Sequence, residues 1–152
     1  MRLLTRFALL SSLALAPFGA VATPPVIDSQ TVDGYQLDTV AEGLDFPWCV
    51  AFLPNGDLLV TQRNGEMVRV DTAGEKHVIH GTPAVYHAGQ GGLFDVMLSP
   101  DFAQTGILYL SYAAGTPSAN HTSVMKARLE GNNLLDGEVI FAASPTKATA
   151  AR

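Results

Sequence analysis

Short apolar runs recur along the chain, and clusters of turn residues separate them. The runs are rich in Val, Ile, Leu and Tyr, and none follows the 3.6-residue period of a long amphipathic helix. They predict an all-β fold with these strands: Tyr35–Val40, Cys49–Leu53, Leu58–Gln62, Met67–Val70, His77–Ile79, Leu93–Leu98, Ile107–Tyr112, Ser123–Leu129 and Glu138–Phe141.

The turns between these strands have a physical cause. Pro54-Asn55-Gly56-Asp57 joins two apolar runs; proline presets φ, while Asn and Gly tolerate positive φ. Asn64-Gly65, Gly74 and Gly131-Asn132-Asn133 mark further reversals. Consecutive strands joined by such short turns predict an antiparallel meander.

The strands group into two similar units. Ala51–Pro54 resembles Met97–Pro100, and the two prolines lie 46 residues apart. Four-stranded units of about 40–50 residues are typical of β-propeller blades. The second unit is predicted to carry a loop insertion, Ala113–Thr122, rich in Gly, Pro, Ser and Asn. On periodicity alone, a sandwich or small barrel stays open as an alternative.

The N-terminus has the pattern of a cleaved secretory signal. Arg2 and Arg6 precede an apolar run from Phe7 to about Ala16, and Ala20-Val21-Ala22 forms an A-x-A site. A membrane anchor is the alternative, but this run is short for a bilayer about 30 Å thick. We therefore expect residues 1–22 to be a signal peptide and the protein to be periplasmic or secreted.

The net charge limits the classes of partner, and the cysteine content excludes an internal disulfide. The formal net charge is −5, and losing two arginines and no acids with the signal makes it −7. Such a balance, without a basic run, argues against nucleic acid and anionic membrane surfaces as partners. Cys49 is the lone cysteine, so no internal disulfide forms, and its apolar neighbours predict a buried small residue.

Several motifs, in order, resemble one known family. These are Phe46-Pro47-Trp48 with the following strand and turn, Gly89-Gln90-Gly91-Gly92-Leu93, the turn Pro100-Asp101-Phe102 and the strand Ile107–Tyr112. From about Gln36 to Phe141 the chain is similar to the quinone-dependent glucose/sorbosone dehydrogenases, and in particular to the soluble, periplasmic aldose sugar dehydrogenases. We expect residues 23–141 to be the N-terminal blades of such a protein.

The resemblance implies a fold and a chemistry. Members of the family are propellers of six four-stranded blades, of which this chain would hold about the first two to two and a half. They hold pyrroloquinoline quinone (PQQ) in a central cleft beside Ca²⁺. A histidine removes the proton from the anomeric hydroxyl of an aldose, the C1 hydride passes to the quinone, and a lactone leaves.

One functional position of the family falls within this chain. Gln90 matches the glutamine that faces the sugar at the mouth of the cleft, and its amide can both donate to and accept from sugar hydroxyls. Glycines on both sides would let the backbone come close to a ligand. The alternative is that Gln90 only caps the loop before the next strand.

The last residues of the chain, 142–152, depart from the pattern of the family. Residues 142–152 lack strand alternation, and no histidine follows His121, whereas the family's catalytic histidine opens the third blade. We therefore expect residues 142–152 to be a frameshifted or truncated tail. On this reading no catalytic residue lies in this chain, and the chain by itself is an inactive fragment that binds PQQ and Ca²⁺ poorly.

The remaining polar residues offer weaker candidates. His77, His80, His87 and His121 have no family support as a base, although His87 neighbours Gln90. Asp95 and Asp101 suit strand and turn positions, Arg63 suits the surface, and no calcium-loop pattern or metal ligand set is evident. Asn120-His121-Thr122 matches a glycosylation acceptor, a pattern common by chance.

Three functions remain open from the sequence. The first is a quinone-dependent aldose dehydrogenase, the second a non-catalytic, β-rich secreted module that binds a carbohydrate or a partner, and the third a product without activity. The sequence does not name the preferred sugar, the electron acceptor or the oligomeric state.

Overall fold

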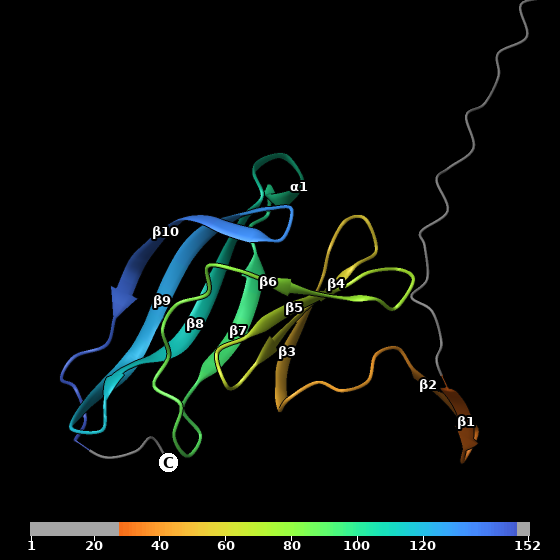
Figure 1. Ribbon diagram of the computed structural model, residues 1–152, viewed down its shortest axis with the longest axis horizontal. Helices are drawn as coiled ribbons and strands as arrows, with labels where there is room; N and C mark the ends of the chain where they lie inside the picture. The colour runs from red at the N-terminus through yellow and green to blue at the C-terminus, as the bar shows by residue number, and fades with distance from the viewer. Residues whose placement is uncertain (1–27, 149–152) are drawn as a thin grey trace, which may run out of the picture.

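Two four-stranded antiparallel sheets, one separate hairpin and one short helix make up the regular structure of residues 28–148 (Figure 1). The computed structural model describes residues 28–148, and the predicted signal segment, residues 1–22, lies outside them. The elements are β1 Asp28–Val32, β2 Tyr35–Thr39, β3 Pro47–Phe52, β4 Leu58–Gln62, β5 Met67–Val70, β6 Lys76–Ile79, β7 Leu93–Leu98, α1 Phe102–Thr105, β8 Ile107–Thr116, β9 Ala119–Glu130 and β10 Asn133–Ala142. Within the described residues, no helix has the length and apolar character needed to cross a membrane.

The first sheet is the predicted meander, with strand order β3-β4-β5-β6. Its turns close by backbone hydrogen bonds, as where the amide of Gly56 donates to the carbonyl of Leu53 over 2.9 Å. Gly56 and Gly65 have φ of 91° and 106°, a conformation that glycine adopts without steric cost. The turn residues read from the sequence therefore explain the path of this sheet.

The second sheet has strand order β10-β9-β8-β7 and corrects one prediction. The segment Ala113–Thr122, predicted to be an inserted loop, is mostly strand, because β8 and β9 stay paired out to Thr116 and Ala119. Only Pro117 and Ser118 turn the chain. Gly, Pro and Ser made this segment resemble a loop, but continuous cross-strand pairing keeps it extended.

The N-terminal hairpin was only half predicted. β2 matches the expected strand, whereas β1 was not foreseen, since Asp28–Val32 alternates poorly. The two strands pair from Asp28 with Thr39 to Val32 with Tyr35, around a turn in which Asp33 and Gly34 both have positive φ. Figure 1 shows this hairpin standing apart from the two sheets.

The main core lies between the facing surfaces of the two sheets. Because side chains alternate across a strand, one face of each sheet supplies this core. Leu59, Met67, Leu93, Leu108 and Leu110 are all fully buried there. The relative position of the sheets is therefore set by the burial of apolar area.

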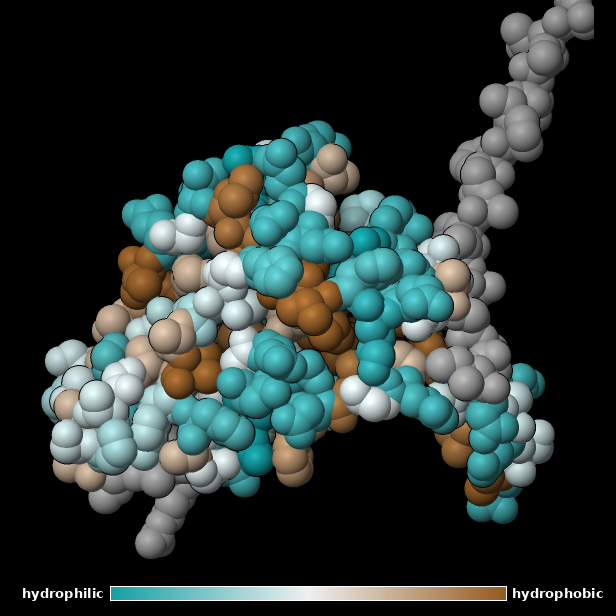
Figure 2. Space-filling view, in the orientation of Figure 1, coloured by the Kyte–Doolittle hydropathy of each residue, from teal (hydrophilic) through white to brown (hydrophobic). Residues whose placement is uncertain are grey.

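The outer faces of both sheets are apolar as well. On the first sheet, Val60, Val68 and Val70 form a second cluster, while Val50 and Phe52 remain exposed. Exposed apolar residues on the second sheet are Met97, Leu135, Val139, Ile140 and Phe141. Figure 2 shows hydrophobic residues at the surface over β10. A two-layer sandwich would present polar outer faces, so this pattern is that of stacked blades.

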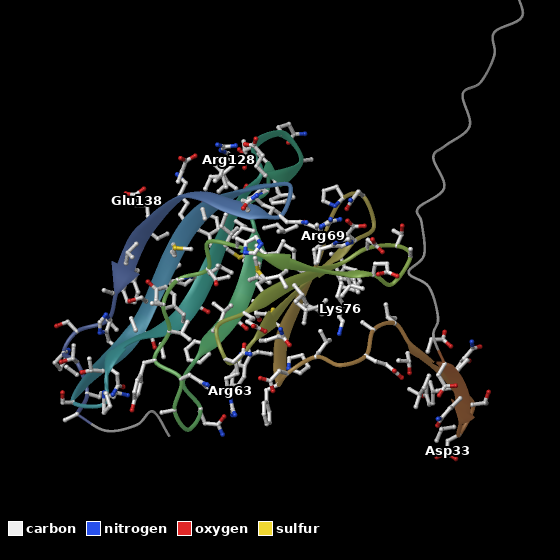
Figure 3. The ribbon with its side chains drawn as sticks, in the orientation of Figure 1. Asp33, Arg63, Arg69, Lys76, Arg128 and Glu138 are labelled. Atoms are coloured by element: carbon white, nitrogen blue, oxygen red, sulfur yellow. The ribbon has the colours of Figure 1, made fainter. Side chains whose placement is uncertain are left out.

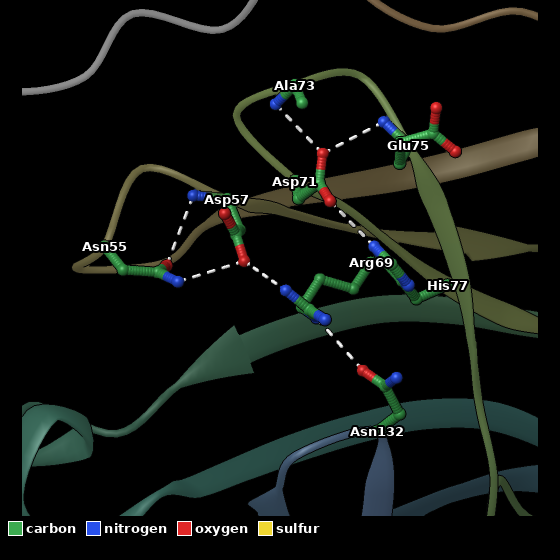
Figure 4. Close-up of polar contacts among 8 residues, drawn as sticks. All are labelled: Asn55, Asp57, Arg69, Asp71, Ala73, Glu75, His77 and Asn132. Atoms are coloured by element: carbon green, nitrogen blue, oxygen red, sulfur yellow. Dashed lines mark hydrogen bonds and ion pairs between the residues drawn. The ribbon is translucent and has the colours of Figure 1, made fainter.

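One end of the interface between the sheets carries a polar network that we call the Arg69 clasp. Arg69 and Asp57 form an ion pair within the first sheet, and Arg69 also bonds to Asn132 of the second (Figure 4). Nη1 of Arg69 lies 2.5 Å from Oδ2 of Asp57, whose side chain is only 5% exposed. Nε of Arg69 donates over 3.1 Å to Oδ1 of Asn132, in the turn between β9 and β10. Next to it, the amide of Leu134 donates to the carbonyl of His80, linking β10 to the end of β6. The clasp therefore fixes one edge of the sheet-to-sheet interface.

Replacing Arg69 by Ala is expected to lower the free energy of unfolding by about 3 kcal/mol, because it leaves the buried Asp57 carboxylate without a cation. Adding Asp57→Asn should recover part of the loss, since it removes the unpaired charge. Urea denaturation of wild type, both single variants and the double variant measures this coupling. Strictly additive losses would contradict the clasp.

A second polar network shapes the turn between β5 and β6 (Figure 4). Oδ1 of Asp71 accepts the amides of Ala73 and Glu75 at 2.9 and 3.0 Å. Nε2 of His77 lies 2.8 Å from Oδ2 of Asp71. The hydrogen bond from His77, followed by the two amides, lowers the pKa of Asp71 below its ordinary value.

The lowered pKa of Asp71 predicts how this turn depends on pH. A carboxyl with a depressed pKa in the folded state adds stability above the pKa it has when unfolded, and that stability is lost as the pH falls through its folded pKa. The difference in unfolding free energy between wild type and Asp71→Asn should thus shrink from pH 6 to pH 3. Denaturation curves at several pH values measure it, and a constant difference would be inconsistent with this origin.

Candidate functional site

The loop that carries Gln90 lies at the opposite end of the sheets from the Arg69 clasp. Figure 3 labels Arg63 beside this loop and Arg69 at the far end. We define the Gln90 loop as residues 86–92. Its ends are tied to β8, because the amide of Tyr86 donates to the carbonyl of Ala113 and the amide of Ala113 donates to the carbonyl of Gly92. The loop thus rests on the second sheet.

Glycine is required at three positions around Gln90. Gly89 has φ of 58°. A Cβ atom at Gly91 would lie 2.7 Å from the carbonyl oxygen of Tyr86, and one at Gly92 would lie 1.9 Å from that of Arg63. No real Cβ atom approaches backbone so closely, so any side chain at Gly92 would displace the loop. The glycines around Gln90 therefore allow close contact between loop and strand.

Gln90 itself is exposed at this loop. Its side-chain amide forms no hydrogen bond with any residue in 28–148. Both its donor and its acceptor atoms therefore remain available to a ligand. A side chain that capped the loop would instead bond to nearby backbone groups.

Arg63, at the end of β4, lies next to the loop. The prediction of a surface role was incomplete, because the side chain is half-buried. Its guanidinium carbon lies 4.6 Å from the centre of the Phe46 ring, and its Nε is buried without a partner among the described residues. Trp48 and Phe94 pack close together between the sheets, with ring centres 5.5 Å apart. The stacking of Arg63 on Phe46 could not be predicted from the sequence, because the two residues are 17 positions apart in the chain.

The histidines are spread across the fold. His77 pairs with Asp71, and His80 links β6 to β10. His87 is exposed within the Gln90 loop, and His121 lies on β9 with its Nδ1 buried and unpartnered among the described residues. Of the four histidines, only His87 belongs to the Gln90 loop.

The other predicted positions have structural roles. Asp101 accepts a hydrogen bond from the Ser99 hydroxyl, which lowers the pKa of Asp101, and this fits the predicted turn role. Asp95 is exposed on β7. Cys49 is only half-buried, although it packs against the main core. Asn120 is 3% exposed and donates to the carbonyl of Thr116, so its amide is inaccessible to a glycosylating enzyme.

No metal site is assembled by residues 28–148. Within this part of the chain, no group of three or more His, Cys, Asp or Glu side chains could hold an ion. A groove of about 620 Å³ lies at the clasp end, far from Gln90. Its charged residues, Asp57 and Arg69, already satisfy each other. The described residues alone therefore do not form a site that fits Ca²⁺.

Two face-to-face meanders with apolar outer faces define consecutive blades of a β-propeller. The chain belongs to the glucose/sorbosone dehydrogenase family, whose sequence model matches residues 44–152. This match runs through residues 142–152, where the sequence suggested a departure from the family; that departure stays a prediction. The all-β propeller fold and the resemblance inferred from the sequence are both confirmed.

Individual relatives agree with this assignment. The chain is 40% identical over 117 residues to a protein of Synechocystis sp., covering 71% of this chain and 28% of that protein. It is 36% identical over 118 residues to the aldose sugar dehydrogenase of Escherichia coli, covering 74% and 32%. The PQQ-bound aldose sugar dehydrogenase of Streptomyces coelicolor superimposes with a TM-score of 0.61 at 33% identity, covering 81% and 36%. The chain spans about a third of the length of these relatives.

Gly92→Ala is expected to destabilise the chain far more than Gly131→Ala. Both glycines have positive φ, but a Cβ at Gly131 meets no atom within 4 Å, whereas one at Gly92 overlaps the carbonyl of Arg63. The Gly131 variant should lose about 1 kcal/mol from backbone strain alone. Urea denaturation measures both, and equal losses would show that the close approach at Gly92 is not what holds the loop.

Proposed function

We propose that this chain forms the first two blades of a quinone-dependent aldose dehydrogenase and that Gln90 contacts the sugar substrate. The observation that carries the proposal is the Gln90 amide, which bonds to none of the described residues and stands on a loop whose glycines permit close packing against Arg63. Membership of the family and the PQQ-bound relative support the reaction class.

The contribution of this chain would be to bind and orient the sugar. The amide oxygen of Gln90 can accept from one sugar hydroxyl, while its NH₂ group donates to a neighbouring one. PQQ, when bound, would supply the hydride acceptor. Residues 28–148 do not form a complete seat for PQQ or for Ca²⁺, so the proton-abstracting base and the cofactor contacts would come from other blades of a complete ring.

The apolar outer faces argue against a stand-alone secreted module. Val50 and Phe52 on β3 are 48% and 72% exposed, and Met97 on β7 is 61% exposed. Faces of this kind in a soluble protein mark contacts with further structure. They support a propeller in which each blade is covered on both sides.

We also propose a periplasmic or secreted location. The support is the N-terminal pattern of a signal peptide over residues 1–22 and the acidic balance of the remaining chain. Aldose sugars and no nucleic acid would be the partners expected there.

A chimera tests the proposed function. Residues 44–148 would replace the matching segment of the Escherichia coli aldose sugar dehydrogenase, and a dye-linked assay with added PQQ, Ca²⁺ and glucose would report activity. We expect sugar oxidation, and Gln90→Ala should raise KM about tenfold, since losing a ligand hydrogen bond costs about 1.4 kcal/mol.

The matched control is Gln104→Ala, which removes an exposed amide from α1 at the clasp end. It should leave KM unchanged. A folded chimera that binds PQQ but oxidises no aldose would contradict the proposed function. An active chimera in which Gln90→Ala leaves KM unchanged would show that Gln90 does not contact the sugar.

A further inference from the structure

The backbone of Arg63 joins the entry of the first sheet to the start of the second. Its amide donates to the carbonyl of Phe46 over 3.1 Å, and its carbonyl accepts the amide of Leu93 over 3.2 Å. Leu93 directly follows the Gln90 loop. The position of Arg63 therefore fixes the point at which the loop enters β7.

The side chain of Arg63 continues this contact. A Cβ at Gly92 would lie 2.7 Å from Cγ of Arg63, so the aliphatic part of the side chain covers the glycine. The guanidinium lies over the Phe46 ring, and Figure 3 shows it beside the loop. Among residues 28–148, no carboxylate forms a salt bridge with it. The guanidinium is therefore placed by the ring and by Gly92.

This arrangement is costly for a purely structural residue. Nε of Arg63 is buried with no partner among residues 28–148 and so loses its hydration, while stacking on an exposed ring returns only about 0.5–1 kcal/mol. Phe46 also holds φ of 48°, which is unfavourable for a bulky residue. Strain of this kind collects at functional sites, where a fixed geometry matters more than stability.

We infer that Arg63 is a positioning residue for the Gln90 loop. Its side chain, wedged between Phe46 and Gly92, holds residues 86–92 at the height where Gln90 can meet a ligand. The inference rests on the proposed function, because the position of the loop affects sugar binding only if Gln90 contacts the sugar. Arg63 acts only through the loop.

Nuclear magnetic resonance of the ¹⁵N-labelled full chain tests the inference. In Arg63→Ala we expect the Leu93 amide to exchange with solvent at least about tenfold faster, equivalent to about 1.4 kcal/mol, and the Gln90 side-chain amide resonances to move. Arg63→Lys should restore much of the wild-type spectrum, because it keeps both the Cγ atom and a cation over the ring. The matched control is Arg128→Ala, whose guanidinium pairs with Glu130 and Asp136 on the second sheet, and it should leave both signals unchanged.

Phe46→Leu provides a second, milder variant in case Arg63→Ala does not fold. Phe46 is 63% exposed, so its loss disturbs little core, yet it removes the surface under the guanidinium. It should shift the same loop resonances in the same direction. Unchanged loop signals in a folded Arg63 variant, or equal changes in Arg128→Ala, would overturn the inference.

The two proposals fail separately. If Gln90→Ala leaves KM unchanged in the chimera, Gln90 does not contact the sugar. The exchange data on Arg63 still show whether its side chain positions the loop. If Gln90→Ala raises KM but Arg63→Ala leaves Leu93 exchange unchanged, only the positioning role falls. In the chimera, Arg63→Ala should raise KM more than it lowers kcat. In a chimera that already carries Gln90→Ala, adding Arg63→Ala should raise KM little further.

Discussion

The burial of two apolar sheet faces against each other is the constraint on which the rest of the structure depends. Leu59 from the first sheet and Leu108 and Leu110 from the second are fully buried in the shared core. Each strand can supply only one face to this core because its side chains alternate. The register of every strand, and hence the position of each turn and loop, follows from that burial.

With the sheets fixed, the two ends of the interface acquire different properties. At one end the Arg69 clasp satisfies its own charges and leaves little for a ligand to bind. At the other end, the Gln90 loop is anchored through its backbone, and none of residues 28–148 bonds to the side-chain amide of Gln90. A rigid scaffold that presents an unsatisfied polar group on a loop is the usual arrangement of a binding site.

The outer faces connect the architecture to the family. In a repeat fold each unit contacts only its neighbours, and its apolar faces are covered by stacking. The chain spans about a third of its relatives, and both its outer faces are apolar. The two blades described here have the surfaces expected of consecutive members of a ring, and Gln90 lies at one end of their shared interface.

The sequence by itself determined the strands, most turns and the two-unit repeat, because alternation and glycine turns are local steric rules. Its motifs were also sufficient to place the chain in its family and to single out Gln90. Tertiary structure alone decided that Ala113–Thr122 extends as paired strand and that β1 forms. It also decided that Arg63 stacks on Phe46 beneath the loop. These features arise from contacts between distant residues, whose free energy does not appear in any local pattern.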